Sequence, residues 1–268
     1  TVQETLIIPL YARKVCSELY PNLYRDETAV RLIDEIDYDF SEAEKNSRGL
    51  MQRFGSLEVA MRQNDLAFEV RDYLKSHPNA AVVNLGCGLD STGRSCDNGS
   101  CKIYNLDFPD VIAVRNELLP AGEREENIPC DLNNTEWFRK IDYSNGAVFF
   151  ASGVFYYFLT EQVKALVQRM ADAFPGGVLV LDAANRMAVK MIAKTWLKSA
   201  KIQDVGAYFA VSDAKSELSP WESRLQVTSR GYMLGYNDLC DPSVSGFFRF
   251  LAKVGDGMMK MQIVKINF

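Results

Sequence analysis

The residues best suited to chemistry in this chain are two glycines and an acid that follow a short apolar run. Residues 81–85 are mostly apolar, Gly86 and Gly88 come directly after them, and Asp90 follows. Such a run predicts a buried parallel strand, and glycines at its end let the backbone turn tightly beneath a bound nucleotide. The spacing therefore indicates a nucleotide-type cofactor site at the carboxyl end of this strand.

The residue after this turn bears on which cofactor it serves. A dinucleotide fingerprint requires a third glycine at position 91, where this chain has Ser91. The pattern therefore favours S-adenosylmethionine over a nicotinamide cofactor. Short glycine patterns also occur by chance, so an ordinary strand-to-helix turn is the alternative at this point.

Two further acids follow the next predicted strands. Residues 101–106 predict a second strand that leads into Asp107, about 20 residues after Gly86, the spacing at which an acid binds ribose hydroxyls in nucleotide-binding α/β folds. A third strand ending near Asp131 places another carboxylate at the same edge. That carboxylate can accept a hydrogen bond from an adenine amino group, or it can cap the short helix through Trp137. The sequence leaves both roles open.

Candidates for the acceptor site follow a fourth predicted strand over residues 146–151. After Ser152 and Gly153 the chain continues with Val154, Phe155, Tyr156 and Tyr157. We predict that these last four residues line the acceptor and that Tyr157 orients the nucleophile. The alternative is that they belong to the core, as aromatic residues after a strand more commonly do.

The alternation of strands and helices from residue 80 onward is typical of an α/β fold with a mainly parallel sheet. A helix starting at Thr160 has the 3.6-residue apolar period and precedes a fifth strand through Asp182. The remaining predictions are a helix over 185–200, irregular chain over 201–224, and antiparallel strands over 225–229 and 258–268. Together they predict a Rossmann-like sheet of the S-adenosylmethionine-dependent methyltransferase type, mostly parallel with an antiparallel final strand.

The residues before the sheet predict helices. Asp26 can cap one helix, and a later apolar period ends at His77, because a proline follows it. Residues 37–46, between the two helices, are polar and acidic and predict a loop. We therefore divide the chain into an N-terminal helical lid, residues 1–79, and a Rossmann-like methyltransferase domain, residues 80–268.

Composition argues against several classes of partner. The net charge is −5 and no dense basic block is present, which argues against nucleic-acid binding. No apolar run approaches the ~20 residues that span a bilayer, and no signal core precedes the first helix, so we predict a cytoplasmic protein without a membrane partner. The six cysteines are scattered, and we expect reduced thiols and no metal. A disulfide or metal site at Cys96 and Cys101 is the alternative.

Six segments of the chain match one protein family in the order in which they occur there. The glycine turn alone would not be enough to indicate this family. The segments are residues 4–13, residues 36–40, Arg62, residues 83–90, residues 104–110 and residues 153–157. In this order they resemble the leucine carboxyl methyltransferase-like family, and within it the tetracenomycin-type polyketide O-methyltransferases. The resemblance implies an S-adenosylmethionine-dependent O-methyltransferase for a carboxylate or hydroxyl of a polyketide-like small molecule. The alternatives are a non-catalytic S-adenosylmethionine-binding protein and a methyltransferase for protein C-terminal carboxyl groups.

The same resemblance implies which residues bind the cofactor. Gly86 and Gly88 let the backbone approach its methionine part, Asp107 holds the ribose, and Asp131 and Leu132 flank the adenine.

Three further positions also take implied roles. Arg62 should clasp the cofactor carboxylate, because a guanidinium fork matches carboxylate geometry; a solvated helix charge is the alternative. Ser152 belongs to the cofactor-binding set, although the family often carries an acid or a glycine there. Arg13 is a catalytic candidate, and with Tyr11 it is a weaker candidate for closing the site.

The prediction of the acceptor type rests on the lack of a histidine that could act as a general base. The single histidine, His77, lies at the end of a predicted helix. A carboxylate is already ionised at neutral pH, whereas a phenol or alcohol requires a positioned base. We therefore predict a carboxylic acid acceptor, held by an arginine such as Arg13 or Arg186. Tyr157, Asp182 or a lysine is the alternative, as the base for a phenol.

Overall fold

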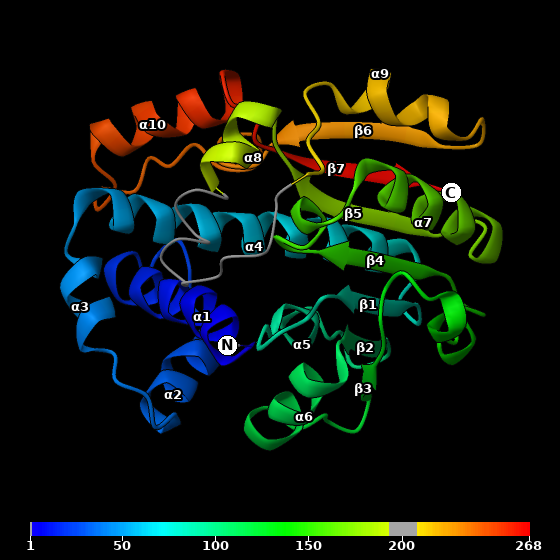
Figure 1. Cartoon of the computed structure of the whole chain (residues 1–268), viewed down its shortest axis with the longest axis horizontal. Helices are drawn as coiled ribbons and strands as arrows, with labels where there is room; N and C mark the ends of the chain where they lie inside the picture. The colour runs from blue at the N-terminus through cyan, green and yellow to red at the C-terminus, as the bar shows by residue number, and fades with distance from the viewer. Residues whose placement is uncertain (1, 193–207) are drawn as a thin grey trace.

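The centre of the protein is a seven-stranded mixed sheet (Figure 1), seen in a computed structural model that describes residues 2–192 and 208–268. The strands are β1 (Ala81–Leu85), β2 (Lys102–Asp107), β3 (Glu125–Pro129), β4 (Ala147–Ala151), β5 (Val178–Ala183), β6 (Gln226–Gly231) and β7 (Gln262–Asn267). Their order is β3-β2-β1-β4-β5-β7-β6, and β7 pairs antiparallel with both of its neighbours. The predicted Rossmann-like class with an antiparallel final strand is confirmed.

The strand order reverses at β1, which has β2 on one side and β4 on the other, both parallel to it. In open α/β sheets, ligands bind outside the carboxyl ends of the strands at such a switch point. Strands β1, β4 and β5 are buried at every residue, as expected where helices cover both faces. The carboxyl ends of β1 and β4 are therefore the expected place for a site.

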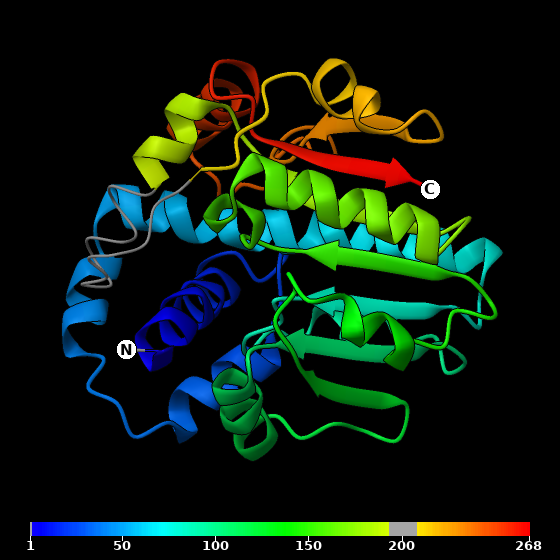
Figure 2. The same ribbon diagram turned by 45° about the vertical axis from the view of Figure 1, so that its right-hand side comes forward.

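Helices cover both faces of this sheet. Helix α4 (Leu50–Ser76) packs with Val82 on one face, and α7 (Thr160–Ala173) packs with Val83 on the other. Figure 2 shows α4 and α7 on opposite sides of the sheet. The other described helices are α1 (Val2–Leu19), α2 (Glu27–Glu35), α3 (Ser41–Ser47), α5 (Thr92–Ser95), α6 (Pro109–Leu118), α8 (Arg186–Ile192), α9 (Ala214–Leu218), α10 (Gly246–Gly257), and the short 3-10 helices η1 (Thr135–Lys140), η2 (Phe155–Tyr157) and η4 (Ser219–Trp221).

Some local predictions differ from the structure. The loop predicted over residues 37–46 is wrong in its second half, because α3 begins there after Asp39 Oδ1 accepts a hydrogen bond from the backbone N–H of Ser41 at 3.0 Å. Helix α10 was not predicted; Ser245 caps it by accepting from the N–H of Phe248. The helix predicted over 185–200 corresponds to α8, and the part beyond residue 192 lies outside the described residues.

The N-terminal helices are joined to the sheet by apolar contacts. Leu10 of α1, Leu32 of α2 and Leu89 after β1 form one buried cluster, and Figure 1 shows α1 on the side of the sheet toward which the arrowhead of β4 points. Helix α4, in contrast, is a layer of the sheet itself. The division of the chain at residue 79 therefore stays a prediction.

The sequence also predicted reduced cysteines and no membrane-spanning segment. All six cysteines lie in the described part of the chain and are free. Burial raises the pKa of the Cys96 thiol to about 11, and Cys101 is buried as well. Within residues 2–192 and 208–268, none of the helices is both long and apolar enough to cross a bilayer.

A polar cluster lies where α4 meets the segment after β6. Asp65 is almost fully buried; its Oδ1 accepts a hydrogen bond from Asn237 Nδ2 at 3.2 Å, and its Oδ2 has no partner among the described residues. Burial raises the pKa of Asp65 to about 9, and Asp256 and Glu69 add to the effect. Asp65 is therefore protonated in the folded protein at neutral pH.

We expect Asp65→Asn to stabilise the protein at pH 8 by about 1–2 kcal/mol. The folded pKa of about 9 lies above that of an unfolded aspartate, near 4. Stability from this group is therefore complete below pH ~4 and is lost as the pH rises toward 9. Urea unfolding between pH 5 and 9 measures the slope, with Asp72→Asn on the same helix as the control. The prediction is wrong if both variants keep the wild-type slope.

Candidate functional site

The glycine turn after β1 has a backbone conformation that glycine adopts without strain. Gly86 has φ +68° and Gly88 has φ +46°, both in the left-handed region. A Cβ atom on Gly86 would lie 2.6 Å from Cγ2 of Val154. The chain after β4 therefore packs directly on the turn and leaves no room for a side chain at position 86.

Asp107 ends β2 and binds the same turn. Its Oδ2 accepts a hydrogen bond from the N–H of Gly88, and its Oδ1 accepts one from the N–H of Phe108, both at 2.8 Å. Burial raises the pKa of Asp107, and these two N–H groups oppose the shift. The carboxylate is thus fixed beside the turn, at the sheet edge where the sequence predicted the ribose-binding acid.

Asp90 and Arg115 stabilise the glycine turn through buried hydrogen bonds. The carboxylate of Asp90 accepts hydrogen bonds from Thr92 and Asn84. Arg115, buried on α6, donates through Nη1 to the backbone oxygens of Gly88 and Asp90, each at 2.8 Å. Sequence reasoning missed Arg115; the available signal was a basic residue close to the apolar positions of a predicted helix.

Arg62 reaches from α4 to the carboxyl end of β5. Its Nη1 lies 3.1 Å from Oδ2 of Asp182, whose Oδ1 accepts a hydrogen bond from the N–H of Gly153 at 2.6 Å. Burial opposes the charge of Arg62, but Asp182, Tyr232 and Tyr156 together outweigh burial and raise the pKa of Arg62. The Nε of Arg62 is buried and has no partner among the described residues. Arg62 is therefore an oriented cation whose buried Nε–H donor is not used by any described residue.

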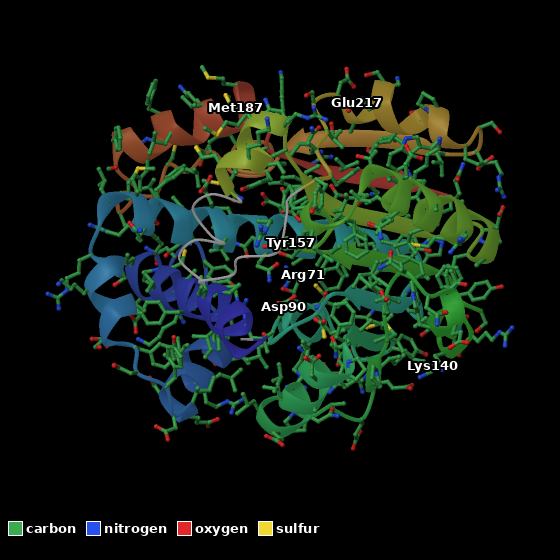
Figure 3. All side chains as sticks on the ribbon, in the orientation of Figure 1. Arg71, Asp90, Lys140, Tyr157, Met187 and Glu217 are labelled. Carbon is green, nitrogen blue, oxygen red and sulfur yellow. The ribbon has the colours of Figure 1, made fainter. Side chains whose placement is uncertain are left out.

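The residues after β4 divide between the core and the site. Phe155 is buried in the apolar cluster that contains α7, so the prediction that it lines the acceptor is wrong. Tyr156 is buried too, whereas Tyr157 is 43% exposed. Burial raises the pKa of Tyr157, and Arg62 opposes this shift, which places the phenol within electrostatic range of Arg62. Figure 3 shows Tyr157 and Asp90 in the middle of the view, where the helical N-terminal part meets the sheet.

Comparison with known proteins identifies the family. The model of the leucine carboxyl methyltransferase family matches residues 9–171, more than half of the chain. The chain belongs to the leucine carboxyl methyltransferase family. The tetracenomycin polyketide synthesis O-methyltransferase TcmP of Streptomyces glaucescens is 28% identical over 183 residues, which are 68% of this chain and 66% of that protein. The match therefore spans just under two thirds of this relative's length.

Solved structures support the methyltransferase fold. A putative methyltransferase from Thermobifida fusca is 16% identical, with 95% of this chain and 93% of that chain covered and a TM-score of 0.57. The plantazolicin methyltransferase BpumL in complex with SAH is 12% identical, with 99% and 98% covered and a TM-score of 0.52. At these identities the likeness establishes the fold alone.

Three other cofactor positions expected from the leucine carboxyl methyltransferase resemblance follow β3 and β4. Ser152 has a buried Oγ without a hydrogen-bond partner among the described residues. Asp131 is exposed and accepts a hydrogen bond from the N–H of Asn133, while Asn134 caps η1, so the alternative role of Asp131 as the helix cap is wrong. Leu132 is buried next to it. Their contacts with the cofactor stay predictions.

Arg13 is bonded to Asp26 and Leu89. Its Nε donates to Oδ2 of Asp26 at 2.9 Å, and its Nη2 donates to the backbone oxygen of Leu89 at 3.0 Å. These bonds tie α1 to the segment that follows the glycine turn. The structure does not place this buried guanidinium with Tyr157, and its catalytic role stays a prediction.

The other residues considered for the acceptor lie elsewhere. Tyr11 stacks on Phe40 with a centroid distance of 5.5 Å, and Arg186 is exposed at the start of α8. His77 is the C-cap residue of α4 and stacks on Tyr73, so the predicted end of the helix at this residue is confirmed.

The residues at the strand ends fit a ligand that carries a carboxylate and a ribose. Arg62 Nε and Ser152 Oγ are buried polar atoms that no described residue satisfies, and such atoms usually have a partner. The Asp107 carboxylate can accept further hydrogen bonds, since each oxygen accepts only one from the protein backbone. The glycine turn beside them allows close backbone approach. The donor set matches S-adenosylmethionine, the cofactor that family membership supports.

Proposed function

We propose that this chain transfers the methyl group of S-adenosylmethionine to an oxygen atom of a small-molecule acceptor. The observation that carries the proposal is Arg62, held at the sheet edge by Asp182 with its buried Nε unpaired. Membership of the leucine carboxyl methyltransferase family and the printed activity of TcmP support the same reaction.

Each part of the cofactor has a matching protein group. The guanidinium of Arg62 would hold the methionine carboxylate, since charge-assisted pairs of this kind are the stronger hydrogen bonds. Asp107 would accept hydrogen bonds from the ribose hydroxyls, and Asp131 with Leu132 would flank the adenine. The glycine turn would let the backbone lie close to the ligand without a side chain between them.

The protein's part in methyl transfer is alignment. S-adenosylmethionine supplies an electrophilic methyl group when bound. The protein must hold the acceptor oxygen in line with that group and keep water away from it. We propose that Tyr157 orients the acceptor, because it is partly exposed and lies within electrostatic range of Arg62.

The acceptor we propose is a polyketide-like small molecule that presents a carboxylate or a hydroxyl. The support is the match to TcmP, whose printed name describes polyketide O-methylation. We further infer a cytoplasmic enzyme, because scattered free cysteines are usual in a reducing compartment. Methylation of a panel of aromatic polyketides by the purified chain tests the acceptor class.

We expect Arg62→Ala to weaken binding of S-adenosylhomocysteine by about 1.5–3 kcal/mol, because a charge-assisted pair to the ligand carboxylate is lost. Isothermal titration calorimetry measures this directly. Arg71→Ala is the matched control, since Arg71 lies on the same helix but is exposed and donates to the backbone oxygen of Ser95. If Arg62→Ala and wild type bind S-adenosylhomocysteine with equal affinity, Arg62 pairs with Asp182 but does not bind the cofactor. A wild-type chain that binds no S-adenosylhomocysteine would overturn the proposed function.

A further inference from the structure

Arg115 lies on the buried face of α6. This helix begins two residues after Asp107, and its buried residues are Val111, Ile112 and Arg115. Positions three and four apart share one face of a helix, so Arg115 lies on the apolar face although it carries a permanent charge. The residue is 1% exposed, and Figure 1 shows α6 next to β3. The fold therefore keeps a cation in the interior, where α6 meets the sheet.

The buried guanidinium of Arg115 is bonded to neutral oxygen atoms. Its Nη1 donates to the backbone oxygens of Gly88 and Asp90, each at 2.8 Å, and its Nε donates to Oδ1 of Asn127 at 3.1 Å. In the part of the chain that the structure describes, no carboxylate forms an ion pair with Arg115. A buried charge without an opposite charge is costly, so an apolar side chain would fill this space with less loss of stability. The charge is therefore best explained by the backbone oxygens that it binds.

Gly88 is the residue whose conformation these bonds fix. A glycine adopts many backbone conformations, and the φ of +46° at Gly88 is only one of them. Arg115 binds the carbonyl oxygen that follows the Gly88 Cα, and Asp107 Oδ2 accepts a hydrogen bond from the N–H that precedes it, each at 2.8 Å. The peptide groups on both sides of this glycine are thus fixed, one by Arg115 and the other by Asp107.

Asn127 on β3 orients the guanidinium. Its Oδ1 accepts hydrogen bonds from Arg115 Nε and from Asn105 Nδ2, both at 3.1 Å, and its own Nδ2 donates to Asn116 at 2.8 Å. Asn105 is buried on β2. Because the guanidinium is planar and its N–H groups have fixed directions, a bond at Nε also sets the direction of Nη1. Strands β2 and β3 are therefore connected to the glycine turn through the side chain of Arg115.

We propose that Arg115 is a positioning residue for the cofactor, which holds Gly88 in the conformation that lets the turn and Asp107 bind the adenosine part of S-adenosylmethionine. This inference rests on the proposed function, in which Asp107 accepts hydrogen bonds from the ribose hydroxyls. Arg115 acts through the turn and not through a contact with the ligand. Since the turn is fixed before the cofactor arrives, binding does not have to order a flexible glycine segment.

The first test measures the affinity for S-adenosylhomocysteine by calorimetry. Arg115→Met keeps an unbranched side chain but removes the donors, and we expect it to weaken binding about tenfold or more. Arg115→Lys keeps a charge and can still donate to the two backbone oxygens, so it should recover part of this loss. A folded Arg115→Met with wild-type affinity would overturn the proposal.

Arg94 on α5 supplies the matched control. It lies close to the turn in sequence, but it donates to the carboxylate of Glu125 and to the backbone oxygen of Pro120. Arg94→Met therefore removes an arginine that joins other segments, and it should keep the wild-type affinity for S-adenosylhomocysteine. An equal loss of affinity in Arg94→Met and Arg115→Met would show a general effect of lost stability and would overturn the specific role of Arg115.

A second ligand distinguishes Arg115 from Arg62. The compound 5′-methylthioadenosine carries the adenine and ribose of the cofactor but lacks its carboxylate. Arg115→Met should weaken the binding of this compound by a factor similar to that for S-adenosylhomocysteine, because the effect is transmitted to Asp107. Arg62→Ala should leave it unchanged. A loss in Arg115→Met that is confined to S-adenosylhomocysteine would contradict the proposed role.

A double variant tests the connection between Arg115 and Asp107. Arg115→Met combined with Asp107→Asn should weaken binding less than the product of the two single effects, because both changes disturb the same contact with the ribose. Two independent effects would overturn the connection. If Arg115→Met does not fold, Asn127→Ala replaces it, since this change leaves the cation in place and removes the acceptor of its Nε. It should weaken the binding of both ligands about threefold, and wild-type affinities would then overturn the proposal.

The outcomes separate this inference from the proposed function. Urea unfolding shows whether each variant is folded under the conditions of the calorimetry. A wild-type chain that binds S-adenosylhomocysteine, together with an Arg115→Met chain that binds it equally well, would remove the role of Arg115 and leave methyl transfer intact. Failure of wild type itself to bind S-adenosylhomocysteine would contradict the proposed function instead.

Discussion

Asp182→Ala should lower the free energy of unfolding by about 3–5 kcal/mol, the range measured when one partner of a buried ion pair is removed. The Asp182 side chain is only 2% exposed. Its loss would leave the Arg62 guanidinium without its 3.1 Å partner and the N–H of Gly153 without its acceptor. Urea unfolding at neutral pH measures the change. Cofactor affinity should fall as well, because Arg62 loses the contact that orients it.

The double variant separates the ion pair from the rest of the site. Combined with Arg62→Ala, Asp182→Ala should cost clearly less than the sum of the two single changes, because no charge is then left unpaired. Asp182→Asn should fall between wild type and alanine, since its amide oxygen can still accept from Gly153. Strict additivity of Arg62→Ala and Asp182→Ala would show that the pair is not coupled.

Gly86→Ala should destabilise the protein by about 2–4 kcal/mol and weaken S-adenosylhomocysteine binding at least tenfold. An alanine at φ +68° is strained, and its Cβ would lie 2.6 Å from Cγ2 of Val154. The neighbouring chain would have to move, and that chain carries Ser152 and Gly153 of the proposed cofactor site. Thermal unfolding and calorimetry measure the two effects.

Gly99 supplies a matched control for this substitution. It also has a positive φ, +84°, but a Cβ there would meet nothing within 4 Å. Gly99→Ala should therefore show only the backbone cost, about 1 kcal/mol. Adding Val154→Ala to Gly86→Ala should restore part of the loss by making room. Equal effects at positions 86 and 99 would mean that the contact with Val154 is unimportant.

The site residues that could be predicted from the sequence are those that directly follow a recognisable strand. Gly86, Gly88 and Asp107 follow strands whose apolar runs are plain in the sequence, and parallel strands bring their carboxyl ends to one edge. The family resemblance added Arg62, which periodicity alone could not distinguish from a solvated charge. The mainly parallel sheet and its antiparallel final strand also followed from the alternation of elements and from that resemblance.

The missed features depend on contacts between residues far apart in the chain. Arg62 and Asp182 are 120 positions apart in the sequence, and the residues around each of them do not indicate that the two side chains pair. The bonds of Arg13 to Asp26 and Leu89 exist only because α1 docks against the segment after β1. Phe155 and Tyr157 are alike in sequence context, and only packing makes one core and the other partly exposed.

The position of β7 has a consequence for the chain during synthesis. Strand β7 comes last in sequence but lies between β5 and β6, so β6 has no partner in the described sheet until residues 262–267 have left the ribosome. Neighbouring strands lie about 4.8 Å apart, so the gap between β5 and β6 is about twice that distance, too wide for hydrogen bonds. The nascent protein therefore exposes an unpaired edge of β5, the kind of edge that recruits other chains. Protection of that edge by a chaperone would matter most before β7 has left the ribosome.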